Sequence, residues 1–186
     1  MQQERLKMLI VSALFAAIIG ILAQLTIPLP LVPITGQTIG IGLAGTILGR
    51  KYGTISVLLY LALGAIGIPV FAGGASGFGV LIGTTGGYLI GFIVTVYIIG
   101  YYIEKTSLTI IQAMIANTIG MFVTLIIGTV WLKYAASLSW QASIAGGFTP
   151  FVLVGLIKAY LASALGVVVS KRLIKANLLK RHDISA

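Results

Sequence analysis

Residues 148–169 read FTPFVLVGLIKAYLASALGVVV, an almost uninterrupted run of apolar and small side chains. A helix needs about 20 mostly apolar residues to cross a bilayer, so this run predicts a membrane-spanning helix. Its one full charge is Lys158. A charge near the bilayer centre costs on the order of 3 kcal/mol on insertion scales, and such a residue usually faces a cavity or a partner. Lys158 is therefore a candidate functional residue.

The composition of the whole chain is that of a membrane protein. Of 186 residues, 59% are hydrophobic and 8% are charged, whereas a soluble domain has roughly 25% charged residues. We expect a multi-pass protein of the cell (cytoplasmic) membrane, surrounded by the lipid bilayer. The net charge of +9 does not indicate nucleic-acid binding, because the cations lie at the ends of apolar runs instead of on one water-exposed face.

Interruptions by proline, glycine and charge predict an all-α fold of six transmembrane helices in a single domain, residues 1–186. The helices are expected near residues 8–27, 36–50, 53–69, 79–103, 107–131 and 148–171. The first is too long for a signal-peptide core of roughly 7–15 residues, and we interpret it as uncleaved. The second is short and rich in glycine, so we expect it to be tilted or continuous with a packed loop.

The distribution of Lys and Arg predicts the orientation. Lys133 lies on one side of the predicted membrane, and ten cations lie on the other. The positive-inside rule then places both termini in the cytoplasm, and the loops near 28–35, 70–78 and 132–147 outside. The ten cations are Arg5, Lys7, Arg50, Lys51, Lys105, Lys171, Arg172, Lys175, Lys180 and Arg181.

The titratable residues make catalysis improbable. The three acids, Glu4, Glu104 and Asp183, are all expected on the cytoplasmic side, His182 is the one histidine, and the chain has no cysteine. These residues cannot form a carboxylate pair, a histidine triad or a metal cluster within the membrane. The sequence also lacks a GxxxxGK[ST] phosphate loop. The energy for transport would therefore come from a solute gradient or from a partner.

Lys158 has three interpretations. It could be a structural cation bound to a helix-end carbonyl or water, or it could snorkel to an interface, although a depth of roughly 15 Å at 1.5 Å per residue is large for snorkelling. We favour the third, a counter-ion for an anionic solute. Tyr88 supports it, since a helix near 79–103 would place Tyr88 at a similar depth of roughly 13 Å.

Other polar residues could complete an apolar pocket around Lys158. Asn117 is expected deeper in the membrane, and it either bonds a neighbouring helix or contacts the solute. Thr35, Gln37 and Thr38 lie near the first outer loop. The implied solute is small, with an apolar body and an anionic end.

Several ordered motifs cover nearly the whole chain: PITGQT at 33–38, LAGTILG at 43–49, YLALGAIGIPVFAGG at 60–74, GTTGGYLIGF at 83–92 and PFVLVGLIKA at 150–159. They resemble the BioY family, the biotin-binding membrane subunits of energy-coupling-factor (ECF) vitamin transporters. The resemblance implies the six-helix fold of a substrate-binding (S) component. It also implies high-affinity biotin binding and uptake as part of an ECF-type ABC transporter.

The resemblance further implies a site beneath the first, third and fifth loops, in which Lys158 meets the biotin carboxylate. The other implied site residues are Thr35, Gln37, Phe71, Gly73, Gly74, Gly86 and Tyr88. The chain departs from the family pattern at two positions. Thr84 replaces a usual proline, and Gly155 stands where the family segment often has an acid three residues before the lysine.

Ala13 and Ala17 match the AxxxA feature by which S-components are thought to dock a transmembrane coupling subunit that is carried by two ATPases. Packing of the chain on itself is the alternative. On the docking interpretation the partners hydrolyse ATP, and this chain needs no cofactor. The main rival function is a stand-alone facilitator for a small organic anion. A structural subunit without a ligand is a second rival, and an intramembrane enzyme is the last.

Overall fold

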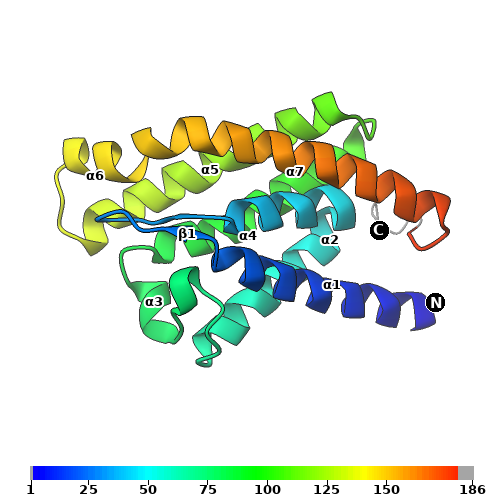
Figure 1. Cartoon of the computed structure of the whole chain (residues 1–186), viewed down its shortest axis with the longest axis horizontal. Coiled ribbons are helices and arrows are strands. Elements are labelled where there is room, and N and C mark those ends of the chain that lie inside the picture. Colours follow the sequence, from blue (N-terminus) through cyan, green and yellow to red (C-terminus); the bar gives the residue numbers. More distant parts are fainter. Residues whose placement is uncertain (1, 180–186) are drawn as a thin grey trace.

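The computed structural model describes residues 2–179, in which long helices lie side by side (Figure 1). The long helices are α1 (Gln2–Ala23), α2 (Gln37–Ala65), α4 (Gly86–Lys105), α5 (Ile110–Ala135) and α7 (Thr149–Lys175). The short elements are β1 (Thr26–Ile27), β2 (Ile34–Thr35), η1 (Ala72–Gly74), α3 (Phe78–Ile82) and α6 (Trp140–Gly147). Four residues used above, Lys180, Arg181, His182 and Asp183, lie outside the described residues.

Gly49 divides α2 into two arms. Its φ of 73° lies in the left-handed region, which glycine adopts without a steric penalty. The arms fold back on each other, since the Gln37 amide at the start of the first arm is hydrogen-bonded to the Tyr60 hydroxyl on the second. The helices expected near 36–50 and 53–69 are these two arms. The first arm is buried along most of its length and ends at Gly49.

The chain makes six passes. By length and composition, α1, α4, α5 and the run 140–175 can each cross a membrane. The two arms of α2 supply the other two passes, although Arg50 and Lys51 at their turn keep α2 as a whole from resembling one apolar span. In Figure 1, α1 begins and α7 ends at the same end of the molecule, as an even number of passes requires.

The opposite end of the molecule is more structured than the sequence suggests. The expected helix near 79–103 is broken, because Gly83 has an extended backbone between α3 and α4. The expected loop near 132–147 contains α6, which starts where Ser139 Oγ accepts a hydrogen bond from the Ala142 N–H at 3.1 Å. The first outer loop closes as an antiparallel pair in which Thr26 faces Thr35.

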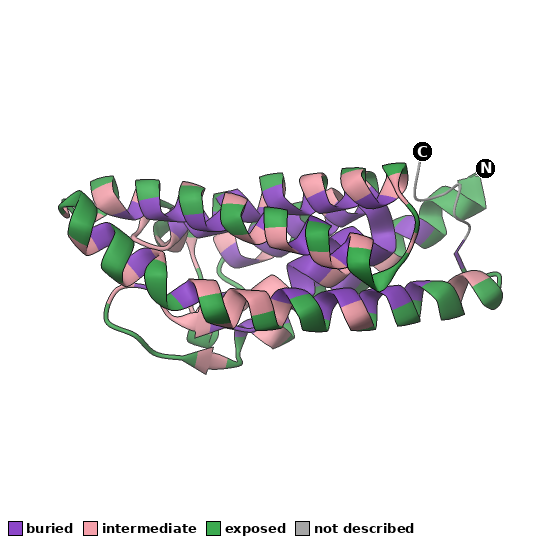
Figure 2. Cartoon of the chain, turned by 90° about the horizontal axis from the view of Figure 1, so that it is seen from above, coloured by how far each residue is buried: buried purple, intermediate pink, exposed green. Residues whose placement is uncertain are grey.

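The outer faces of the helices are apolar, and Figure 2 shows buried residues on their inner sides. Ile21, Ile111 and Leu153 are among the most exposed side chains, at 68%, 72% and 70%. Contiguous exposed apolar surface of this kind marks contact with a membrane or a partner. This surface agrees with the expected membrane location.

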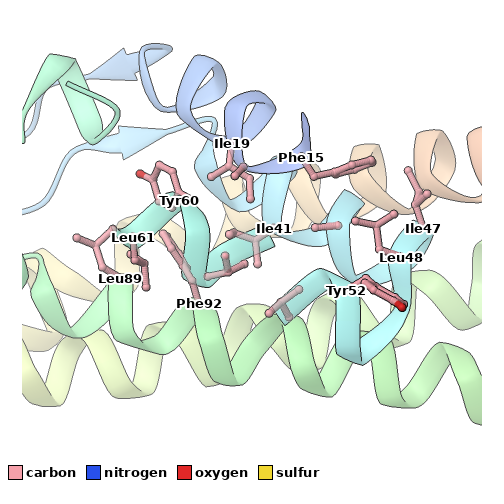
Figure 3. Close-up of a cluster of buried hydrophobic side chains, with 14 of the residues drawn as sticks. Phe15, Ile19, Ile41, Ile47, Leu48, Tyr52, Tyr60, Leu61, Leu89 and Phe92 are labelled. Atoms are coloured by element: carbon pink, nitrogen blue, oxygen red, sulfur yellow. The ribbon is translucent and has the colours of Figure 1, made fainter. Parts of the chain in front are cut away.

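The largest apolar core lies between α1, α2 and α4 (Figure 3). Ile19 of α1 and Ile41 of α2 are almost fully buried there, and Phe92 of α4 packs from the other side. Tyr60 and Phe71 also belong to this cluster, with ring centroids 5.6 Å apart and planes at 84°. The core therefore reaches the loop that follows α2.

Glu104 ties the C-terminal end of α4 to the turn of α2. Its side chain is 3% exposed, Oε1 accepts the Arg50 backbone N–H at 2.7 Å, and Oε2 lies 3.1 Å from Arg50 Nε.

We expect Glu104→Ala to lower the free energy of unfolding by about 1–2 kcal/mol, because it removes both of these contacts. The loss is limited to this range because solvent still reaches the partly exposed guanidinium. Thermal unfolding in detergent would measure this. Glu104→Gln keeps an acceptor and should lose less, and equal melting temperatures for all three proteins would contradict the assignment.

Candidate functional site

A cavity of about 280 Å³ lies among α2, α4, α5, α7 and the two loops that flank α2. Its walls are mainly apolar, as in most small-molecule sites. Lys158 is the one charged side chain among the described residues that line it. The polar lining comprises Thr35, Gln37, Thr38, Thr85, Tyr88, Thr95, Asn117, Thr124 and Lys158.

Lys158 is the tenth residue of α7, which begins at Thr149 with Pro150 in its first turn, where a missing N–H costs nothing. The Lys158 Nζ donates to the Thr35 carbonyl at 2.7 Å. This bond holds the ammonium at the cavity wall, against the loop before α2, and does not favour the snorkelling interpretation. This contact uses one of the three N–H donors, so it is compatible with both a structural cation and a counter-ion.

Thr35 and Gln37 stand at the cavity wall and bond each other. Thr35 Oγ1 donates to Gln37 Oε1 at 2.8 Å and accepts the Gln37 backbone N–H at 3.3 Å. Beside them, Thr38 Oγ1 is buried and has no hydrogen-bond partner within the described part of the chain. Buried polar atoms usually have partners, so Thr38 is a candidate contact for a bound molecule.

Tyr88 and Asn117 line the cavity but are already engaged. The Tyr88 hydroxyl donates to the Gly147 carbonyl at 2.7 Å. Tyr88 lies in the first turn of α4, so the continuous helix near 79–103 from which its depth was predicted is interrupted. Asn117 Nδ2 lies 3.1 Å from both Thr46 Oγ1 and Ser163 Oγ. Asn117 therefore bonds two neighbouring helices, which was the alternative to a contact with the solute.

Three predicted glycines do not line the cavity. Gly73 and Gly74 have φ values of 63° and 79° and form the turn that follows Phe71, which does line it. Gly86 begins α4, where any Cβ would collide with the Leu81 carbonyl. These glycines shape the loop and the helix start, while their neighbours contact the cavity.

Most of the apolar wall of the cavity was not predicted from the sequence. On α5, Met121 and Leu125 line the cavity four and eight residues after Asn117, which is the spacing of one helix face. On α7, Phe151 lies seven residues before Lys158 and also lines the cavity. Helical periodicity counted from each polar candidate could have identified these residues.

Gly155 brings α5 and α7 together at this wall. A Cβ at Gly155 would collide with Met121 Sδ. Met121 therefore occupies the space beside the α7 backbone, one turn before Lys158. No acidic side chain accompanies the lysine among the described cavity residues.

Ala13 and Ala17 lie on α1, outside the cavity, and both are exposed. Their flank of α1 also carries the exposed Leu14 and Ile21. Within the described chain, these two alanines are not the small-residue contact that packs α1 on its neighbours. This small-residue surface is open to lipid or to another subunit.

Comparison with known proteins gives consistent matches. The BioY family profile matches residues 1–175. Biotin transporter BioY2 of Lactococcus lactis subsp. cremoris is 43% identical over 177 residues, which cover 95% of this chain and 97% of that protein. Biotin transporter BioY of Thermotoga maritima is 36% identical over 166 residues, covering 89% and 97%. A crystal structure of the S-component for biotin from an ECF-type ABC transporter matches with a TM-score of 0.84 at 34% identity, covering 92% and 94%.

Proposed function

The chain belongs to the BioY family, and from that membership we propose that it binds biotin at the outer face of the cytoplasmic membrane and serves as the substrate-binding subunit of an ECF-type ABC transporter. The relatives named above are transporters and an S-component, not enzymes. The expected class of function, uptake of a small molecule by a membrane protein, agrees with this family.

The observation that supports biotin most directly is an apolar cavity with a single cation at its wall. Biotin has an apolar thiophane ring and alkyl chain, which suit the walls around Phe92 and Met121. Its carboxylate suits Lys158, since a hydrogen bond to an ionised group contributes about 1.5–3 kcal/mol. Its ureido group needs donors and acceptors, which the hydroxyl and amide groups of the polar lining supply.

Biotin titration of the detergent-purified full chain, followed by calorimetry, tests this function. We expect saturable binding with one biotin per chain. Hexanoate, a small carboxylate without the ring system, serves as the control and should not compete at equal concentration. A folded chain that binds no biotin would refute the proposal, and equal competition by hexanoate would favour a general organic-anion carrier.

For the energy source, we propose a transmembrane coupling subunit and two ATPase subunits, which hydrolyse ATP in place of this chain. The absence of a phosphate loop from the sequence supports this division of labour. Biotin uptake into proteoliposomes, with and without the coupling module, separates this proposal from a stand-alone facilitator. Uptake that is equally fast without the module would favour the facilitator.

The exposed alanines of α1 are the proposed docking surface for the coupling subunit. We expect Ala13→Leu and Ala17→Leu to lower co-purification with that subunit several-fold, because larger side chains keep two helix backbones apart. Biotin affinity should not change, since neither residue lines the cavity. Ala62→Leu, at an exposed alanine of α2, is the matched control. Undiminished co-purification of both α1 variants would place the docking surface elsewhere.

A further inference from the structure

We infer that Tyr60 is a positioning residue for the substrate site: it holds the Gln37 amide as a second hydrogen-bond donor to the substrate carboxylate, beside Lys158. This inference rests on the proposed function and adds to it the way in which the carboxylate is recognised. Tyr60 itself is not among the cavity residues, so it acts through Gln37.

Tyr60 is rigidly placed behind the cavity wall. Its side chain is fully buried in the core between α1, α2 and α4 (Figure 3), and its hydroxyl accepts a hydrogen bond from Gln37 Nε2. Its ring meets the edge of Phe71, which lines the cavity. The turn at Gly49 brings Tyr60 to Gln37, because it folds the second arm of α2 back along the first.

The hydrogen bonds of Thr35 indicate which end of the Gln37 amide faces Tyr60. Thr35 Oγ1 already accepts the Gln37 backbone N–H at 3.3 Å. Its single hydroxyl hydrogen remains free to be donated, and Gln37 Oε1 lies 2.8 Å away as the acceptor. Nε2 is consequently at the Tyr60 end of the amide. Thr35 and Tyr60 together hold both ends of this group.

One N–H of the amide remains for a bound molecule. An amide nitrogen carries two hydrogens, and within the described residues Tyr60 takes one of them. Gln37 lines the cavity, and no described residue takes the second N–H, which we assign to the cavity. The geometry therefore makes Gln37 a donor toward the cavity as long as its amide cannot turn.

This donor lies near the ammonium of Lys158. Both side chains contact Thr35, because Lys158 Nζ is bonded to its carbonyl at 2.7 Å and Gln37 Oε1 to its hydroxyl at 2.8 Å. Two neighbouring donors match the two oxygens of a carboxylate. A carboxamide offers a single oxygen, so it can accept a hydrogen bond from only one of the two donors. The pair of donors thus favours an acid over its amide beyond the effect of charge alone.

The test compares biotin with biotin carboxamide in calorimetric titrations of the full chain. Tyr60→Phe keeps the ring and removes the hydroxyl that holds Nε2, and Thr35→Val keeps the side-chain shape and removes the hydroxyl that holds Oε1. We expect each variant to lower the ratio of the two affinities several-fold, because the loss falls mainly on the carboxylate. Tyr52→Phe, at another buried tyrosine of α2 outside the cavity, should leave the ratio unchanged.

A merely structural role of Tyr60 would weaken both ligands equally, so an unchanged ratio in Tyr60→Phe and Thr35→Val would overturn the positioning role. If Tyr60→Phe does not fold, the ratio in Thr35→Val decides the question. A wild-type chain that binds no biotin would overturn the proposed function together with this inference. An unchanged ratio with intact biotin binding overturns the inference alone.

Discussion

Lys158→Met should weaken biotin binding by about 10-fold to 100-fold, because it removes a charge-assisted hydrogen bond worth about 1.5–3 kcal/mol. Methionine retains much of the side-chain length and fits an apolar wall. Binding of biotin carboxamide should change far less, since this ligand carries no charge to be paired. Calorimetric titration of both ligands against both proteins gives the four affinities that are needed.

The comparison of the two ligands also tests the structural interpretation of Lys158. The lysine bonds the Thr35 carbonyl, so its loss could loosen the first outer loop and affect any ligand. Equal losses for biotin and biotin carboxamide would therefore remove the carboxylate role and leave Lys158 as a structural cation. Thermal unfolding of the ligand-free variant would then show the loss of stability directly.

Gly155→Leu should lower biotin affinity by about 10-fold or more, since overpacking of a closed wall costs about 1–3 kcal/mol. The new side chain needs the space of Met121 Sδ, and we expect it to push Met121 toward the cavity that it lines. Leucine is a good helix former, so α7 should remain intact. Calorimetry measures the affinity, and thermal unfolding checks the fold.

A second substitution tests the cause of this effect. Gly155→Leu combined with Met121→Ala returns most of the lost volume and should recover part of the affinity. Ile157→Leu, on the exposed face of α7, is the control and should bind biotin like the wild type. A Gly155→Leu protein with unchanged affinity would mean that biotin does not use the wall formed by Met121.

The positions of the membrane passes could be predicted because hydrophobic length is a local property of the chain. The membrane class, the S-component fold and the family are confirmed, and the two arms of α2 with the four long apolar spans agree with six passes. The prediction was wrong where a local backbone conformation mattered more than hydropathy. Gly83 adopts an extended conformation that breaks an apolar run, and this break moves Tyr88 to the first turn of α4.

The candidate site was predicted in part. Lys158, Thr35, Gln37, Phe71, Tyr88 and Asn117 all line one cavity. Each of the polar members of this set is unusual within an apolar run or lies in a recognisable motif, so it can be found by inspection. Their binding roles remain predictions. Met121, Phe92 and Phe151 do not stand out by residue type, because apolar residues occur throughout every span, and only helical spacing from Asn117 and Lys158 indicates Met121 and Phe151.

The sequence alone determined the membrane class, the six passes, the expected orientation and the lysine within an apolar span, since each depends on residue type and on distance along the chain. Only the tertiary structure decided the contacts of these residues. Lys158 reaches a carbonyl 123 positions earlier in the chain, and Tyr60 reaches Gln37 because Gly49 reverses α2. Such partners depend on how helices pack and turn in three dimensions, and hydropathy along the chain does not specify which helices pack together.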